Sequence, residues 1–126
     1  MVDVRYTLAG GNEGLQKLAS AFYCRMFADP IMLPLFADPD ADHAGRLALF
    51  LGEYFGGHAE HTRQRGGRET MAHIHEGLRI SNLQRDRWIE HMHAACKETG
   101  MPREFIDSLE PNLQYFADLA QKDSWA

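Results

Sequence analysis

Residues 75–95, HEGLRISNLQRDRWIEHMHAA, contain a candidate metal ligand followed by the start of an amphipathic helix. From Trp88 onward the apolar side chains recur at helical spacing, and Gly100 and Pro102 mark where this helix ends. His75 lies in a short segment ahead of it, thirteen residues before Trp88. This isolated histidine beside a long apolar helix face guides the interpretation of the rest of the chain.

Three further segments have amphipathic helical patterns. The first follows Asn12, a candidate N-cap, and ends at Asp29-Pro30. The second ends at Gly56-Gly57. The third contains Pro111, which is expected to kink or break the helix. A short helical piece is expected around Thr70–Glu76, and no segment has the pattern of a strand. We therefore predict an all-α domain of four main helices, which pack naturally as two antiparallel pairs. The apolar residues of the three patterns are Leu15, Leu18, Ala19, Phe22 and Met26; Leu47, Phe50, Leu51, Tyr54 and Phe55; and Phe105, Ile106, Leu109, Leu113, Phe116 and Ala120.

Length and charge restrict the possible partners. The 126 residues suit one domain spanning the chain, as a monomer or homodimer. The net charge of −5 argues against nucleic acid and anionic lipid as partners. There is no apolar run near the roughly 20 residues of a membrane span, and no signal-peptide pattern, so we expect a cytoplasmic protein. Cys24 and Cys96 form neither a disulfide framework nor a metal motif, which agrees with that location.

The chain has seven histidines, and most of their spacings do not suit a metal site. His91 and His93 point about 200° apart on a helix, so they cannot bind one ion together. His58 and His61 could share a helix face, but Gly56-Gly57 before them favours a loop. A divalent-metal protein using these loop histidines is kept as an alternative, although no carboxylates or thiolates are spaced to join them.

The large aromatic side chains are more numerous than a four-helix core of this size usually needs. They are Phe22, Tyr23, Phe36, Phe50, Phe55 and Trp88. Plain core packing explains them by composition alone. A flat apolar cofactor is the alternative, because one neutral imidazole in an aromatic-lined cavity is how a protein holds haem iron. His75, between two long apolar helices, is the histidine whose position fits that role.

The order of the motifs resembles that of the truncated haemoglobins, and among them group II. The glycine doublet Gly10-Gly11 comes first, and the later motifs keep the order and spacing of that group over nearly the whole chain. This resemblance implies a truncated globin fold, a 2-on-2 helical sandwich around haem b. The matching stretches are AFYCRMFADPIMLPLF at 21–36, RLALFLGEYFGG at 46–57, QRGG at 64–67 and the stretch at 75–95.

On the proximal side, the resemblance assigns the iron ligand to His75. His73 is the rival, but the two side chains lie on opposite faces of a short helix, so only one can reach the iron. Arg46 matches a basic partner of the haem propionates, and Arg79 is a second candidate. His61 stands where the family commonly has a tyrosine, and it is expected to replace that residue's hydrogen bond to a propionate.

On the distal side, Tyr23 matches the family's helix-B tyrosine and Trp88 the group's helix-G tryptophan. Both can donate a hydrogen bond to a diatomic ligand. Leu47 matches the apolar distal position, and Phe36 and Phe50 are expected to pack against the haem. The alternative for each aromatic residue is a structural role in the core.

His43 departs from the group, in which many members have a small residue at the distal gate. A neutral His43 could donate a hydrogen bond to the ligand, and its protonation would then open the gate towards solvent. It could instead bind the iron directly, or be a loop residue without any haem contact.

The resemblance implies reversible binding of O₂ and of similar ligands such as NO and CO, as in oxygen transport. The alternative is a redox enzyme of the NO dioxygenase or peroxidase type, which would use the same haem and a separate reductase. Residues 122–126, KDSWA, match no motif of the family.

Overall fold

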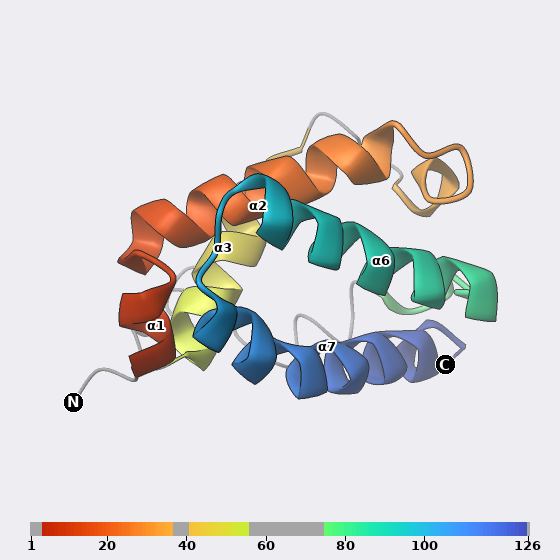
Figure 1. The fold of residues 1–126 in the computed structure, drawn as a ribbon. Helices are drawn as coiled ribbons and strands as arrows, with labels where there is room; N and C mark the ends of the chain where they lie inside the picture. The colour runs from red at the N-terminus through yellow and green to blue at the C-terminus, as the bar shows by residue number, and fades with distance from the viewer. Residues whose placement is uncertain (1–3, 37–40, 56–74, 126) are drawn as a thin grey trace.

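The computed structural model describes residues 4–36, 41–55 and 75–125, and within these ranges it contains helices and no strand (Figure 1). The all-α prediction is therefore confirmed. None of the helices in these ranges is both long and apolar enough to cross a membrane. The elements are α1 (Val4–Leu8), α2 (Gly11–Phe27), the short 3₁₀ helix η1 (Leu33–Leu35), α3 (His43–Tyr54), α6 (Asn82–Glu98) and α7 (Arg103–Ser124).

The four long helices form two packed pairs. Helix α2 packs on α3 and also on α6, and α6 in turn packs on α7. Figure 1 shows α2 and α6 next to each other, α7 beyond α6, and the end of α7 beside the start of α6. The side chains predicted from the α2 pattern, from Leu15 to Met26, are all buried, as are Phe105, Leu109 and Leu113 of α7. Burial of each large apolar side chain stabilises the fold by about 1.5–3 kcal/mol.

The helix ends differ from the sequence prediction at two places. Helix α2 is capped by Gly10, with φ of 89° and no side-chain hydrogen bond, so the prediction of Asn12 as N-cap is wrong. Gly11 also has a positive φ, of 65°, and this left-handed turn between α1 and α2 is easy only for glycine. Pro111 is exposed inside α7 and does not end the helix.

Helix α6 begins with a capping box. The Ser81 hydroxyl accepts from the Gln84 N–H at 3.1 Å, and the Gln84 side chain accepts from the Ser81 N–H at 2.9 Å. This cap fixes where the helix that carries Trp88 starts. The predicted helix stop at Gly56-Gly57, and most of the predicted helical piece at 70–76, lie outside the described residues.

Candidate functional site

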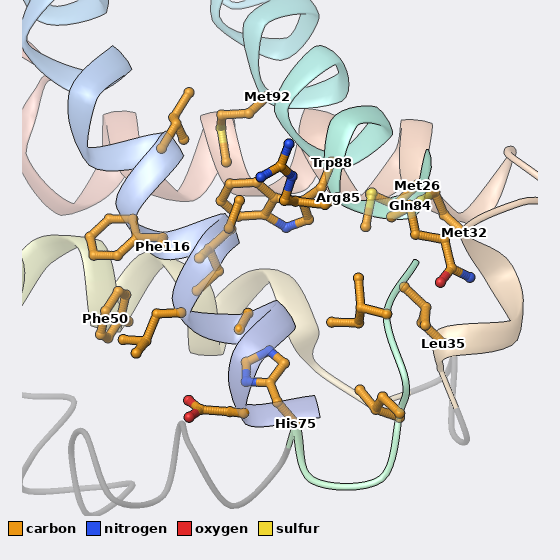
Figure 2. Close-up of a pocket in the computed structure, with 18 of the residues that line it drawn as sticks. Met26, Met32, Leu35, Phe50, His75, Gln84, Arg85, Trp88, Met92 and Phe116 are labelled. Carbon is orange, nitrogen blue, oxygen red and sulfur yellow. The ribbon is translucent and has the colours of Figure 1, made fainter. Parts of the chain in front are cut away.

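A mostly apolar cavity of about 400 Å³ lies between the two helix pairs. Its volume falls within the range of roughly 300–1,000 Å³ that is usual for small-molecule sites. Figure 2 shows His75 on one side of the cavity and Trp88 and Met92 on the opposite side. The predicted site residues that line it are Tyr23, Phe36, Leu47, Phe50, His75 and Trp88.

The wall that carries His75 has little regular structure. His75 is half-buried, and a turn at Glu76-Gly77 follows it, in which the Leu78 N–H donates to the His75 carbonyl at 3.3 Å. Gly77 has φ of 77°, a conformation that favours glycine. Leu78 and Ile80 then line the cavity beside the imidazole, which Figure 2 shows directed from the backbone towards the cavity.

The wall opposite His75 carries Trp88 on α6, and Tyr23 on α2 also lines the cavity. The Phe22 ring touches both, with centroids 4.9 Å from Tyr23 and 5.5 Å from Trp88 in edge-to-face geometry. Neither the Tyr23 hydroxyl nor the Trp88 indole N–H makes a hydrogen bond to any residue in the described ranges. Burial raises the pKa of Tyr23 far above its usual value, so its hydroxyl keeps its proton and can donate. The lining of the cavity therefore offers two hydrogen-bond donors.

His43 lies behind the cavity wall. As the first residue of α3, it packs its ring on Phe36 at 5.0 Å, on Tyr23 at 5.6 Å and on Phe27 at 5.8 Å. Phe36 and Tyr23 line the cavity, whereas His43 does not. The structure thus brings His43 against the predicted distal tyrosine, but not to the cavity surface.

The predicted propionate partners are scattered. Arg46 is exposed and outside the cavity wall. Arg79 is also exposed, and its guanidinium lies over the Trp125 ring, 5.7 Å from the centroid. His61 lies outside the described residues, as does His73.

Arg85 lines the cavity, although no pattern in the sequence predicted a role for it. It pairs with Asp86 at 3.0 Å and with Asp118 at 2.6 Å, and its hydrogen bonds to these carboxylates raise its pKa further. Its position three residues before Trp88 in the stretch at 75–95 was the available signal, but a charged residue near a helix start is usually on the solvated surface.

Several apolar residues of the cavity were also missed. Met32 is buried in the turn between α2 and η1, and Phe116 has the helical spacing predicted for the last helix. Periodicity indicated that such residues face inward, but not that they face a cavity. The missed apolar residues include Met26, Met32, Leu35, Met92, Leu113 and Phe116.

The described ranges contain no group of three or more histidine, cysteine or acidic side chains that could hold a metal ion. The loop histidines of the metal-protein alternative, His58 and His61, lie outside these ranges.

A model of the bacterial-like globin family matches residues 5–122. The chain belongs to this family. Group 2 truncated hemoglobin YjbI of Bacillus subtilis is 29% identical over 107 residues, which are 85% of this chain and 80% of that protein. This agrees with the predicted resemblance to group II truncated haemoglobins, which is confirmed. Globins bind haem and small gaseous ligands, and membership of the family implies that this chain does so too.

Solved structures confirm the 2-on-2 globin fold. The hemoglobin of Thermobifida fusca matches with a TM-score of 0.80 and 31% identity, over 100% of this chain and 98% of that one. The truncated oxygen-avid haemoglobin of Bacillus subtilis matches with a TM-score of 0.80 and 29% identity, over 90% of this chain and 95% of that one.

The residues of this globin fit a haem group. The cavity is largely apolar, as a flat porphyrin requires, and among the described residues that line it His75 alone supplies an imidazole. Tyr23 and Trp88, the two donors without partners in the described ranges, line the same cavity and would be available to a ligand bound there. Of the large aromatic residues noted in the sequence, Tyr23, Phe36, Phe50 and Trp88 line this cavity, whereas Phe22 and Phe55 do not.

Proposed function

We propose that this globin binds O₂ reversibly at haem b, with His75 as the proximal ligand and Tyr23 and Trp88 as distal hydrogen-bond donors. The observation that carries the proposal is the placement of the His75 imidazole opposite Trp88 in one apolar cavity, which Tyr23 also lines. When bound, haem b supplies an iron atom with a coordination position for a diatomic ligand. The oxygen-avid relative from Bacillus subtilis supports this choice of ligand.

The distal residues hold and enclose the ligand. The Tyr23 hydroxyl and the Trp88 indole N–H donate to it, and the indole suits a ligand with negative charge because it cannot accept. Leu47, Phe36 and Phe50 keep water away from the cavity, which strengthens these hydrogen bonds.

Two further features belong to this proposal. His43 restricts ligand access indirectly, because its ring packs on Tyr23 and Phe36. The protein is a single domain in the cytoplasm, and Arg46, Arg79 and His61 remain the proposed propionate partners.

Replacement of the two candidate ligands tests the proposal. The purified parent is expected to be red, with one haem b per chain in a pyridine haemochrome assay. His75→Ala is expected to lose the haem, whereas His73→Ala keeps the normal ferrous spectrum. A normal ferrous histidine spectrum in His75→Ala, together with its loss in His73→Ala, would reverse the assignment. Rapid NO consumption by the oxygenated protein in the presence of a reductase would favour the redox alternative.

A further inference from the structure

The backbone after His75 is held by the end of α7. The Arg79 N–H donates to the Ser124 carbonyl at 3.0 Å, and the Ile80 N–H donates to the Ser124 hydroxyl at 2.9 Å. The Ile80 carbonyl accepts from the Gln121 side chain at 3.2 Å and from the Trp125 indole N–H at 3.1 Å. We call Gln121, Ser124 and Trp125 the α7 anchor. Four hydrogen bonds thus join it to two consecutive residues that lie in no helix.

The conformation of Arg79 shows that these contacts constrain the backbone. Arg79 has φ of 52°, in the left-handed region that side chains other than glycine rarely adopt. Such a conformation persists where the surroundings determine it. The conformation of Arg79 is held by the hydrogen bond from its N–H to the Ser124 carbonyl and by the stacking of its guanidinium on Trp125. Trp125 is 60% exposed, and the stacking and the indole hydrogen bond are the contacts that hold its side chain in place.

The two residues that the α7 anchor holds, Arg79 and Ile80, are close enough in sequence to His75 to fix its backbone. Only three residues separate His75 from Arg79, and the Leu78 N–H bond to the His75 carbonyl closes the turn between them. Ser124 is fully buried, and its hydroxyl also donates to the Gln121 carbonyl at 2.6 Å, so the hydroxyl that binds Ile80 is itself held in place. None of the three anchor residues lines the cavity.

We infer that the α7 anchor positions the His75 imidazole in the cavity and thereby sets the strength of its bond to the haem iron. The inference rests on the proposed function, in which His75 is the proximal ligand. Gln121, Ser124 and Trp125 are positioning residues, because they act through the backbone of residues 78–80. No motif of the family marked this part of the sequence.

The test compares anchor variants of the haem-loaded ferrous protein. Trp125→Phe keeps an aromatic ring under Arg79 but removes the indole donor, and Ser124→Ala removes the hydroxyl. Lys122→Ala, at an exposed position in the same turn, is the matched control. The measurements are the iron–histidine stretching frequency by resonance Raman spectroscopy, the rate of haem transfer to apomyoglobin, and hydrogen exchange of residues 75–81.

We expect both anchor variants to shift the stretching frequency, to lose haem about fivefold faster for each hydrogen bond removed, and to exchange faster at residues 75–81. The control should behave like the parent. An unchanged frequency and haem-loss rate in the Ser124→Ala/Trp125→Phe double variant would overturn the inference, even if exchange rises. Survival of the iron–histidine band in His75→Ala would instead show that His75 is not the proximal ligand and that the proposed function is wrong. This variant therefore distinguishes a failure of the proposed function from a failure of the anchor inference.

Discussion

The two walls of the cavity are built in different ways. Tyr23 and Trp88 project from the middle of long helices, and the Phe22 ring between those helices contacts both. His75 is followed by backbone without helix, which the α7 anchor holds through four hydrogen bonds. The first wall is therefore held by apolar packing and the second by directional polar contacts.

This difference predicts different responses to mutation. Loss of an apolar ring leaves a cavity that neighbouring helices can partly fill, so the cost is spread over the core. Loss of one hydrogen-bonding group leaves its partner unsatisfied at one point of the backbone. Substitutions in the packed wall therefore complement the α7 anchor variants, which alter the wall that carries His75.

The largest effect is expected from Phe22→Ala. Phe22 is fully buried behind Tyr23 and Trp88, and its loss should lower the free energy of unfolding by about 3–5 kcal/mol and speed O₂ dissociation. Phe105→Ala is the matched control, because Phe105 is equally buried and packs on Phe55, outside the cavity wall. Urea unfolding should show similar losses for both, whereas stopped-flow O₂ dissociation should change only for Phe22→Ala. Equal O₂ kinetics in the two variants would contradict the idea that Phe22 fixes the distal wall.

Removal of the donors themselves should have a smaller energetic effect. Loss of a hydrogen bond to a charged ligand costs about 1.5–3 kcal/mol, so Tyr23→Phe and Trp88→Phe should each raise the O₂ dissociation rate about ten- to hundredfold. The double variant should show less than the sum of the two free-energy changes, because neighbours that share one ligand are coupled. Dissociation rates equal to that of the parent in all three variants would remove both residues from the distal role.

The smallest effect concerns a buried polar tie that Asp29 makes between the end of α2 and α6. Asp29, just after α2, bonds to His91 of α6 at 2.8 Å and to the Ile31 N–H at 2.9 Å, with Arg87 at 3.4 Å. The hydrogen bond with His91, and then that from Ile31, lower the pKa of Asp29. Because the pKa of Asp29 is lowered in the folded state, its contacts stabilise the fold at pH values above the ordinary aspartate pKa of about 3.9. This stabilisation is lost as the pH falls from that value through the lowered pKa.

Asp29→Asn should therefore be less stable than the parent at pH 7, and this difference should shrink as the pH falls from 5 to 3. Urea unfolding at a series of pH values measures it. Asp107→Asn, in an exposed pair with Arg103, is the control and should differ little from the parent at any pH. A difference between parent and Asp29→Asn that stays constant with pH would show that the charge of Asp29 plays no part in the tie.

The sequence determined the helices and their inward faces. Hydrophobic periodicity is a local signal, and Leu15, Leu18 and Phe22 are buried because they recur on one side of α2. The spacing of His75 and Trp88, together with the other motifs, indicated the globin fold and a shared cavity. The prediction of Asn12 as N-cap was wrong because Gly10, with a positive φ, begins the helix without a side-chain hydrogen bond. The preference of asparagine for N-cap positions does not reveal such a start.

Only the tertiary structure decided which residues meet across the chain. Ile80 and Ser124 are 44 residues apart, and no local pattern indicates that a serine hydroxyl will accept from that amide. The same holds for Arg85 in the cavity wall and for His43 behind Tyr23. The physical reason is that helix formation depends on neighbours along the sequence. Backbone groups outside helices instead take their partners from whatever element the packing of the helices brings beside them.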